Sequence, residues 1–393
     1  MAEAFALDGR AVVASKPAER GADRLSGWEA PALLLITLVL LSIGLVTVYS
    51  TSAVKAQAQG LPDYHYVLRQ AVGGALGLVL LACAAWVDYR RMRLFAWPLL
   101  AVITVALLVM VVPGTHTIAP VVNGARRWLH LGPVVVQPSE FAKLALIAWT
   151  AALAVKKQDR LPSLSRGLLP FLVVWMVVAG LIFLEPSLSA AAITLLLAAL
   201  VVFAGGARIG HFLLLAIIGL PLVWAKVGDA VYRVRRIATF LDPTIDVEGM
   251  SYQINQSLIA IGSGGVFGRG FGRGQQKYGF LPEPFNDFIF AMFGEEWGLV
   301  GIALLIVLFT AFALIGYRVA RGAPDMFGAL LAVGLTNLIA VQAFLHMGVN
   351  LALTPTTGVT LPFMSYGRSS LLVCMIAVGM LVNIARQAER RTE

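Results

Sequence analysis

Long apolar runs are the feature that most limits what this chain of 393 residues can fold into. A helix needs roughly 20 apolar residues to cross the hydrocarbon core of a bilayer. About ten such runs follow one another, at 29–49, 66–87, 93–113, 138–155, 168–185, 187–205, 208–227, 286–316, 326–350 and 363–385. Charged residues make up only 13% of the chain, against about 25% in soluble domains. The sequence therefore predicts an all-α polytopic membrane protein with about ten transmembrane helices.

Basic residues in the short connections predict the orientation of these helices. Residues 1–27 are polar, and the run that follows is too long for a signal-peptide core, which predicts a cytoplasmic tail and a retained first span. With that end inside, every short inner connection is basic, as the positive-inside rule requires. We therefore expect one transmembrane domain over residues 28–386, a large extracytoplasmic loop at 228–285 between the seventh and eighth helices, and a cytoplasmic C-terminal tail at 387–393.

The outer side also carries many cations, which membrane topology does not require. They are Arg126, Arg127, Arg233, Arg235, Arg236, Arg269, Arg273, Lys277 and Arg368. Outer arginines near the bilayer surface suit an anionic ligand such as a phosphate or pyrophosphate. The alternative is contact with lipid headgroups, or pairing with Asp242, Asp246 and Glu248. Because the net charge of +9 is divided between the two sides of a membrane, we predict no nucleic-acid partner.

A glycine-rich stretch at 260–277 precedes the eighth run. It lacks the terminal Gly-Lys-Ser/Thr and the parent strand of a P-loop, so it is no nucleotide signature. We interpret it as flexible backbone that brings amides, together with Arg269, Arg273 and Lys277, near an anion. An unstructured surface loop is the alternative.

Asp287 stands where this loop meets the apolar run at 286–316. An ionisable group that enters a transmembrane segment is costly, which makes it a functional candidate. A helix N-terminal carboxylate favoured by the helix dipole is the alternative. Glu295 and Glu296 follow about 12–14 Å further along a helix that rises 1.5 Å per residue. We expect these two acids near mid-bilayer, facing protein or water, with Lys143 as a candidate partner.

Other polar residues lie inside the apolar runs. Glu140 and Lys143 are three residues apart and share a helix face, where a mutual ion pair would let both enter the membrane. Gln342, His346 and Asn350 repeat every four residues as one polar stripe. For the stripe, hydrogen bonding between helices is favoured over a catalytic histidine.

An outward-facing, basic, carboxylate-bearing site suits two classes of membrane protein. One is an enzyme that acts on a lipid-linked anionic substrate, and the other is a transporter of an anion or phospholipid. Transporters more often show internal repeats and broken helices near the midplane. The chain shows no convincing repeat, and its best carboxylate lies at the outer rim. These observations favour the enzyme.

Five stretches together resemble the SEDS family (shape, elongation, division and sporulation). They are Asn123-Gly-Ala-Arg-Arg-Trp-Leu129, Gln137-Pro-Ser-Glu-Phe-Ala-Lys143, Gly262-Ser-Gly-Gly-Val-Phe-Gly-Arg-Gly270 with Gln276-Lys277, Leu281-Pro-Glu-Pro-Phe-Asn-Asp-Phe-Ile-Phe-Ala291 with Glu295-Glu-Trp-Gly298, and Leu361-Pro-Phe-Met-Ser-Tyr-Gly-Arg-Ser-Ser370. The resemblance runs from the first span to the C-terminus. Within the family, Asn123–Trp128 and His346-Met-Gly-Val-Asn350 are more similar to the division member FtsW than to the elongation member RodA.

The resemblance implies a ten-span peptidoglycan glycosyltransferase that polymerises lipid II at the outer face of the bacterial cytoplasmic (inner) membrane, at the division septum. It implies a class B penicillin-binding protein of the FtsI type as transpeptidase partner, and FtsQ-, FtsL- and FtsB-type divisome proteins. By motif, Asp287 corresponds to the family's essential aspartate. The substrate-binding candidates are Arg127, Trp128, Glu140, Lys143, Arg269, Arg273, Lys277, Ser365 and Arg368, and the secondary polar candidates are Glu283, Glu295, Glu296, His346 and Asn350.

The implied reaction suits these residue types. A carboxylate at Asp287 would take the proton of an attacking sugar hydroxyl as general base. Arginine and lysine, or a divalent cation (Mg²⁺ or Mn²⁺) near Asp287, would stabilise the undecaprenyl pyrophosphate leaving group. One direct displacement needs no second nucleophilic carboxylate. The alternatives are a lipid II flippase, an elongation-type RodA polymerase and a structural divisome scaffold.

The chain departs from the family pattern at three places. Ser187 stands where an aspartate is common in the outer Glu-Pro-Asp hairpin, which puts a role for that aspartate in doubt. Phe285 and Asn286 replace the usual His-Thr before the key aspartate, which removes a polar helper. Arg368 replaces a glycine, where it would add an anion contact or extend to the membrane interface.

Overall fold

A computed structural model describes residues 25–115, 117–121, 125–132, 134–215, 217, 219, 240 and 249–390. Arg233, Arg235 and Arg236, the acids Asp242, Asp246 and Glu248, and nearly all of the predicted N-terminal tail lie outside these residues. The helices are α1 (Glu29–Ala58), α2 (His65–Trp86), α3 (Arg90–Val111), α4 (Pro138–Lys156), α5 (Leu169–Leu184), α6 (Leu188–Ala204), α9 (Met250–Ser263), α10 (Ile289–Gly322), α11 (Met326–Asn350) and α12 (Arg368–Glu389). Two short helical turns, η1 (Gln158–Arg160) and η2 (Leu164–Leu168), lead into α5.

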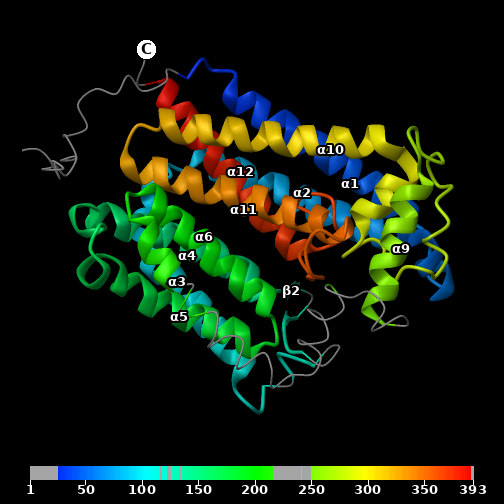
Figure 1. Ribbon diagram of the computed structural model, residues 1–393, viewed down its shortest axis with the longest axis horizontal. Coiled ribbons are helices and arrows are strands. Elements are labelled where there is room, and N and C mark those ends of the chain that lie inside the picture. Colours follow the sequence, from blue (N-terminus) through cyan, green and yellow to red (C-terminus); the bar gives the residue numbers. More distant parts are fainter. Residues whose placement is uncertain are drawn as a thin grey trace, which may run out of the picture.

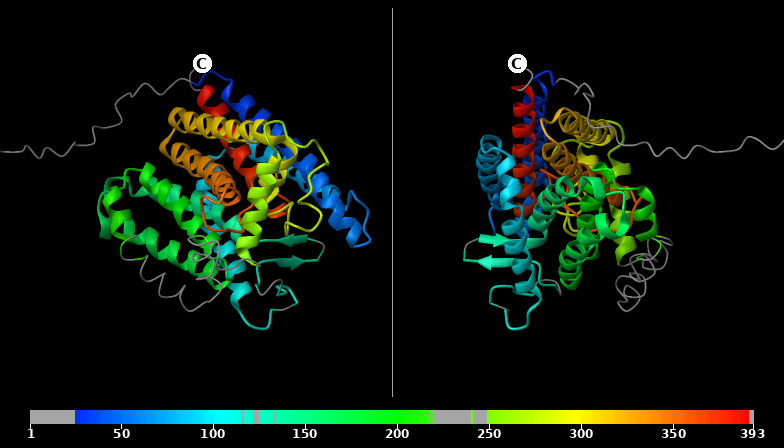
Figure 2. Two further views of the ribbon diagram at one scale, coloured as in Figure 1. Left: turned by 45° about the vertical axis from the view of Figure 1, so that its right-hand side comes forward. Right: turned by 90° about the vertical axis from the view of Figure 1, so that its left-hand side faces the viewer.

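The helices confirm the predicted all-α membrane class. Eight described helices are long and apolar enough to cross a membrane, and α6 is a shorter apolar helix of 17 residues. They coincide with the predicted runs except for 208–227, which is helical at 209–215, 217 and 219; apart from Arg208, its other residues lie outside those described. The prediction missed a small antiparallel hairpin of β1 (Leu129–Leu131) and β2 (Val134–Val136), which projects from the bundle in Figure 2.

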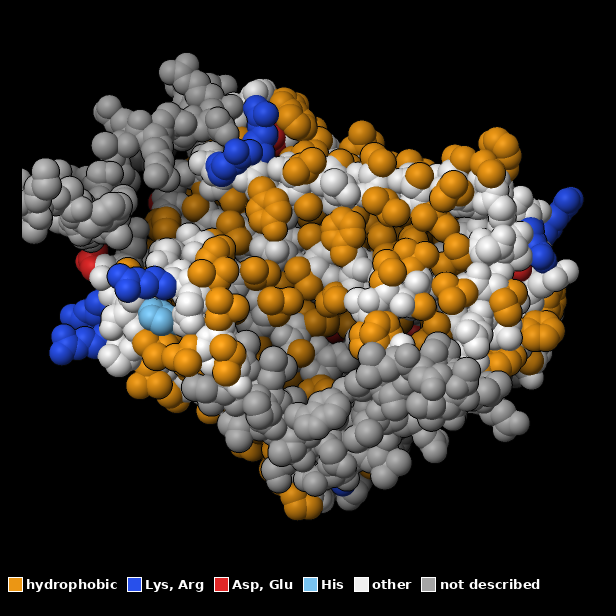
Figure 3. All heavy atoms as spheres, viewed as in Figure 1, with side chains coloured by type: hydrophobic (Ala, Val, Ile, Leu, Met, Phe, Trp, Pro, Cys, Tyr) orange, Lys and Arg blue, Asp and Glu red, His pale blue; other side chains and the backbone are white. Residues whose placement is uncertain are grey.

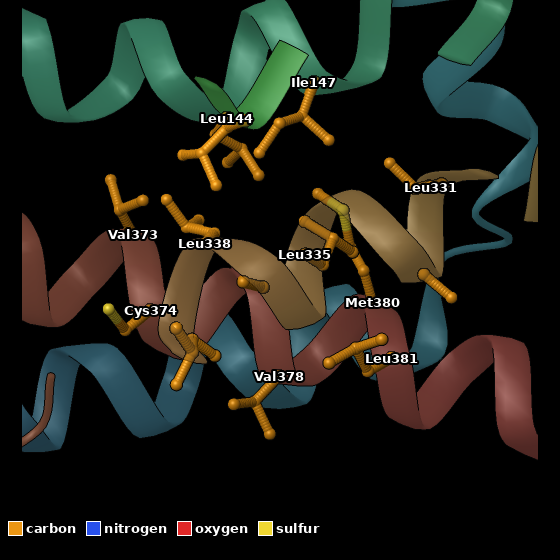
Figure 4. Close-up of a cluster of buried hydrophobic side chains, with 14 of the residues drawn as sticks. Leu144, Ile147, Leu331, Leu335, Leu338, Val373, Cys374, Val378, Met380 and Leu381 are labelled. Atoms are coloured by element: carbon orange, nitrogen blue, oxygen red, sulfur yellow. The ribbon is translucent and has the colours of Figure 1, made fainter. Parts of the chain in front are cut away.

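The helices form two adjoining groups. Figure 1 shows α1, α2, α10, α11 and α12 together, with α3, α4, α5 and α6 beside them. Helices α4, α11 and α12 form the centre, because 72–83% of the apolar window of each is buried, against 22% for α3. Leu144 and Ile147 of α4 face Leu335 and Leu338 of α11, and Val378 of α12 continues the same apolar cluster (Figure 4). The burial of these aliphatic side chains fixes the helices that carry the site.

The helix ends gather at two opposite ends of the bundle. The inner end holds the start of α1, the α2–α3 and α10–α11 connections and the end of α12, which hydrogen bonds such as Asn383 Nδ2 to Ala85 O (2.8 Å) join. The outer end holds the end of α1 and the starts of α2, α10 and α12, joined by Gln70 Nε2 to Ser365 O (3.0 Å). In Figure 3, lysine and arginine side chains gather toward the two ends, with hydrophobic side chains between them. The positive-inside rule assigns the inner end to the cytoplasm.

Helix α10 is broken near its start by Gly298, which has a φ of 66° and a ψ of −163°. A Cβ at this position would come within 2.3 Å of Gly268 N, so only glycine allows the close approach. The helical part that follows, 299–322, extends about 36 Å, which is enough to cross a bilayer. Glu295 and Glu296, which we expected near mid-bilayer, lie in the short outer segment of α10 before the break.

The predicted loop at 228–285 is not entirely a loop. It contains α9, which packs against α10 at the outer end of the bundle (Figure 1). The last helix also extends beyond the predicted end of the transmembrane domain at 386, to Glu389.

Candidate active site

The main chain just before α10 is held at three successive carbonyl groups. Phe285 O accepts a hydrogen bond from Tyr366 N (2.9 Å), and Asn286 O accepts one from Ser365 Oγ (2.8 Å). Asp287 O accepts one from Asn350 Nδ2 (3.1 Å). These donors come from the end of α11 and from the 361–366 segment before α12. The position of the half-buried Asp287 is therefore set from two other parts of the fold.

Asn350 also binds the start of α10. Its Oδ1 accepts a hydrogen bond from the backbone N–H of Ala291 (3.1 Å), in the first turn of the helix. The first backbone N–H groups of a helix have no partner within it, so Asn350 acts as a capping residue supplied by another helix. The helix dipole favours negative charge at this end, where Asp287 lies. Asn350, a secondary candidate from the sequence, is thus a positioning residue for Asp287.

Ser365 was predicted to bind substrate, but its hydroxyl is engaged within the protein. It donates to Asn286 O and accepts from Leu361 N (2.8 Å). The side chain is buried, with 4% of its surface exposed. Ser365 therefore fixes the 361–366 segment against the Asp287 segment.

Glu283 has its charge offset by a residue that the sequence analysis missed. Lys55, at the outer end of α1, lies 2.7 Å from Glu283 Oε1 and 5.1 Å from the centre of the Phe285 ring. The other Glu283 oxygen accepts a hydrogen bond from Asn286 Nδ2 (2.7 Å). Lys55 could have been noticed in the sequence as one more cation on the outer side.

Glu295 and Glu296 bind the glycine-rich loop and not Lys143, so the suggested pairing with Lys143 was wrong. Glu295 accepts hydrogen bonds from Gln275 N (2.7 Å) and Gln276 N (3.2 Å), and lies 3.8 Å from Arg269 Nη1. Glu296 accepts a short hydrogen bond from Ser50 Oγ, and lies 3.4 Å from Lys277 Nζ. Both acids are buried, which places paired charges where the loop meets α10.

Two of the three predicted anion ligands in the loop are consequently used by the protein itself. Arg269 and Lys277 pair with Glu295 and Glu296, and Lys277 also donates to Gly272 O (2.7 Å). The exposed Arg273 has no side-chain hydrogen bond or ion pair with any residue in the described part of the chain. Of these cations, Arg273 remains the candidate for a ligand.

The glycine-rich loop is held by main-chain hydrogen bonds, so the alternative of an unstructured loop was wrong. Arg269 N donates to Glu295 O (3.0 Å), and Leu299 N donates to Gly265 O (2.9 Å). A Cβ on Gly264 would lie 2.1 Å from Gly294 O, and one on Gly268 would lie 2.1 Å from Glu296 O. The glycines therefore allow the backbone of the loop to approach the backbone of α10 closely.

Glu140 and Lys143 form the predicted ion pair in the protein interior. Lys143 Nζ lies 2.7 Å from Glu140 Oε1 and 3.0 Å from Gln342 Oε1 on α11. His346 Nδ1 lies 2.7 Å from Val359 O, while its Nε2 is buried and has no partner among the described residues. The hydrogen bonds from Gln342, His346 and Asn350 confirm that this stripe joins α11 to its neighbours.

Arg127 binds the outer α5–α6 hairpin. Its Nη2 donates to Pro186 O (2.6 Å) and its Nε donates to Glu185 O (3.4 Å). The neighbouring Trp128 is half-buried, and Asn123 and Gly124 of the same motif lie outside the described residues. The Arg127 guanidinium is thus used at least in part to hold the hairpin.

Glu185 is a buried carboxyl group that the sequence analysis did not select. Both of its carboxyl oxygens are without a hydrogen-bond partner among the described residues. Burial raises its pKa to about 8, and the charge of Arg127 acts in the opposite direction. The signal that could have found it is its place beside the proline of the hairpin, at the membrane edge.

Arg368 is the first residue of α12 and is half-buried against Gly73 of α2. Its side chain has no hydrogen bond or ion pair with a described residue. A cation at the positive end of a helix dipole is unfavourable unless an anion lies near it. Arg368 and Arg273 are therefore the predicted cations in the described part of the chain whose contacts leave them suited to an anionic ligand.

The described residues contain no group of three or more histidine, cysteine, aspartate or glutamate side chains arranged to hold a metal ion. A cage made only of protein ligands is therefore absent from this part of the chain. Mg²⁺ is commonly bound by one or two carboxylates together with substrate phosphates. The half-buried Asp287 fits that second arrangement.

Comparison with known proteins places the chain in a family. Residues 31–390 match the FtsW, RodA and SpoVE family, described as cell cycle proteins. Stage V sporulation protein E of Bacillus subtilis is 40% identical over 354 residues, which cover 90% of this chain and 96% of that protein. The "Probable peptidoglycan glycosyltransferase FtsW" of Trichlorobacter lovleyi is 40% identical over 362 residues, which cover 92% and 94%.

Solved structures show the same fold. A chain from a study of "Structural coordination of polymerization and crosslinking by a peptidoglycan synthase complex" superposes with a TM-score of 0.74 at 27% identity, covering 90% of this chain and 97% of that one. The rod shape determining protein RodA of Thermus thermophilus superposes with a TM-score of 0.65 at 28% identity, covering 90% and 96%. The chain therefore belongs to the FtsW/RodA/SpoVE family of cell cycle proteins, the SEDS family that its motifs resemble.

Proposed function

We propose that this protein is a peptidoglycan glycosyltransferase that polymerises lipid II at the outer face of the bacterial cytoplasmic membrane. The observation that carries the proposal is the set of hydrogen bonds to three successive carbonyls, which holds Asp287 in place. A catalytic group gains most when its position is fixed before the substrate binds. The name of the FtsW relative from Trichlorobacter lovleyi supports the same activity.

In this proposal Asp287 is the general base. Its carboxylate takes the proton of the acceptor sugar hydroxyl while that oxygen attacks the anomeric carbon of the donor. The bond from that carbon to the lipid pyrophosphate breaks, and the electron pair leaves with the pyrophosphate. One displacement of this kind inverts the anomeric configuration, so the other acids of the site need not act as nucleophiles.

The two cations that have no partner among the described residues suit the leaving group. Arg273 lies in the loop before Asp287, and Arg368 lies at the start of α12, next to the segment that holds Asp287. Guanidinium groups bind phosphate oxygens through paired hydrogen bonds. We propose that these two arginines bind the pyrophosphate, and a divalent cation held near Asp287 would supply further charge compensation.

We extend the proposal to the division septum and to a partner. The FtsW relatives support division over elongation, although a sporulation protein is equally similar. The structural similarity to a chain of a peptidoglycan synthase complex supports a class B penicillin-binding protein as transpeptidase partner. FtsQ-, FtsL- and FtsB-type proteins are the further partners that we propose.

Lipid II translocation is the second candidate. The observation that favours it is the buried polar group of Glu140, Lys143 and Gln342, since charges inside a bundle commonly mark a transport path. A polymerisation assay in detergent separates the two functions, because detergent micelles have no two sides between which a lipid is moved.

The test is polymerisation of purified lipid II in detergent with a divalent cation, with and without a class B penicillin-binding protein. We expect glycan chains from the wild type and a loss of about 10²–10⁴-fold for Asp287→Asn, the range for a general base. Glu283→Gln is the matched control, because it neutralises another acid of the same segment. Full polymerisation by Asp287→Asn with normal expression would show that Asp287 is not the base.

A further inference from the structure

A polar cavity lies at the inner end of the bundle, opposite to the Asp287 site. Its volume is about 1140 Å³, and it lies where α2 ends, α3 and α11 begin and α12 ends. The lining residues that matter here are Trp86, Asp88, Arg90, Asp325, Arg386 and Arg390. The proposed reaction at the outer face uses none of them, so this cavity needs its own explanation.

The acidic groups of the cavity already have partners. Asp325 accepts hydrogen bonds from Tyr89 OH (2.6 Å), Arg90 Nε (3.0 Å) and Gly328 N (2.9 Å). Asp88 accepts hydrogen bonds from Arg90 N (2.9 Å) and Gln387 Nε2 (3.0 Å). Arg90 offsets the charge of Asp325, and the hydrogen bonds hold both carboxylates in the wall of the cavity.

Two arginines of the cavity, in contrast, have no such partners. Arg386 and Arg390 are exposed and lie four residues apart, on one face of α12. Neither side chain makes a hydrogen bond or ion pair with any of the residues that the structure describes. Like charges at this spacing repel each other. An anion between the two guanidinium groups would replace that repulsion with charge-assisted hydrogen bonds.

Large exposed apolar side chains lie on the helices beside the cavity, next to the exposed Arg91 and Arg93. Trp86 lines the cavity with 84% of its surface exposed, and Leu94, one turn into α3, is 76% exposed. Tryptophan is enriched where a membrane meets water, and exposed leucine on a spanning helix faces acyl chains. The positive-inside rule accounts for arginines at this end, but it does not account for a cavity with satisfied acids, unpaired arginines and an apolar margin.

We propose that this cavity binds the phosphate headgroup of an anionic phospholipid from the inner leaflet. Arg386 and Arg390 bind the phosphate, and the acyl chains lie along Trp86 and Leu94. Basic pockets between transmembrane helices on the cytoplasmic side are known to suit such headgroups. A bound lipid would join the ends of α2, α3, α11 and α12 to the membrane surface.

The test uses the full-length protein purified in detergent, titrated with phosphatidylglycerol, phosphatidylcholine or inorganic phosphate. Native mass spectrometry counts the bound lipid. We expect phosphatidylglycerol to bind the wild type in preference to phosphatidylcholine, and the Arg386→Gln/Arg390→Gln variant to bind it about tenfold or more weakly. The matched control is Arg160→Gln/Arg166→Gln, which removes the same charge at the same end, outside the cavity. The control should bind like the wild type.

Three results would overturn the proposal. They are wild-type affinity in the Arg386→Gln/Arg390→Gln variant, an equal loss in the control variant, and displacement of the lipid by inorganic phosphate at concentrations as low as those of the lipid. The last result would mean a site for a soluble phosphate. A variant with Arg386→Lys and Arg390→Lys keeps the charge without the planar guanidinium group. An affinity for phosphatidylglycerol between those of the wild type and the glutamine variant supports the proposed contacts, even if the glutamine variant folds poorly.

Discussion

At the inner end of the bundle, arginine and tyrosine side chains bind the carboxylates. At the outer end, several carboxyl oxygens are buried without a partner among the described residues. At the inner end, the buried Glu29 accepts a hydrogen bond from Arg318 Nε (2.8 Å), and Asp325 is bound by Tyr89 and Arg90. At the outer end, both oxygens of Glu185 and one oxygen each of Glu140 and Glu296 are buried without a partner among the described residues. A buried polar atom without a partner lowers the stability of the fold. The polar residues of the inner end therefore stabilise the protein more than those of the outer end.

The outer end instead uses its hydrogen bonds on the main chain. The donors Tyr366 N, Ser365 Oγ and Asn350 Nδ2 hold the carbonyls of residues 285–287. Strained backbone also gathers there, since Glu283 (φ 50°) and Phe363 (φ 65°) are non-glycine residues in the left-handed region. The side chains of the inner end therefore stabilise the fold, while those of the outer end hold the backbone in place and leave carboxyl groups for chemistry.

The largest expected effect comes from breaking the one buried ion pair of α4. Lys143→Met leaves the Glu140 carboxylate buried without its cation, which we expect to lower the free energy of unfolding by about 3–5 kcal/mol. The measurement is thermal unfolding in detergent. The exposed lysine at the inner end of the same helix gives the control, Lys156→Met, which should change stability little. Adding Glu140→Gln to Lys143→Met should recover part of the loss, and no recovery would mean that packing and not the buried charge is responsible.

A comparable or smaller effect is expected from Glu185, the acid of the outer hairpin that has no hydrogen-bond partner among the described residues, and it depends on pH. Because the pKa of Glu185 is raised to about 8 in the folded protein, its neutral form stabilises the fold at low pH. That stability is lost as pH rises from the ordinary carboxyl pKa near 4.5 to about 8, where the folded protein also loses the proton. Glu185→Gln should therefore match the wild type near the low end of this window. Above its high end, the variant should be more stable by at most about 5 kcal/mol, because each unit between the two pKa values is worth about 1.4 kcal/mol.

Unfolding midpoints of both proteins across this pH window test the prediction. A wild type and a Glu185→Gln variant that lose stability in parallel would show that Glu185 is already ionised in the folded protein.

The sequence was sufficient for the fold and for the place of Asp287 at the start of α10. Runs of apolar residues predicted the spanning helices, because a helix that crosses the bilayer needs about 20 apolar residues. The helix α11 has the predicted bounds. The resemblance also selected Asp287, which lies at the start of α10 at the outer end.

The partners of the polar residues were not predictable from the sequence. The sequence suggests Lys143 as a partner for Glu295 and Glu296. In the structure, these two acids lie before the break at Gly298 and pair with Arg269 and Lys277. A one-residue change of backbone conformation has no signature in hydropathy. Lys55 escaped notice for a related reason, since its contact with Glu283 joins segments more than two hundred residues apart.

Two buried asparagines offer the most direct test of the difference between the ends. Asn350 at the outer end binds Asp287 O and Ala291 N, and Asn383 at the inner end binds Ala85 O and Tyr89 N. Each replacement by alanine leaves buried backbone groups unpaired, so both variants should lose about 1–2 kcal/mol of stability. Polymerisation per folded molecule should fall about tenfold for Asn350→Ala, because the carboxylate of Asp287 loses its fixed position. It should stay near the wild-type value for Asn383→Ala, whose contacts lie at the opposite end. Equal activities of the two variants at equal stability would mean that the contacts of Asn350 stabilise the fold only. The proposed difference between the two ends would then be wrong.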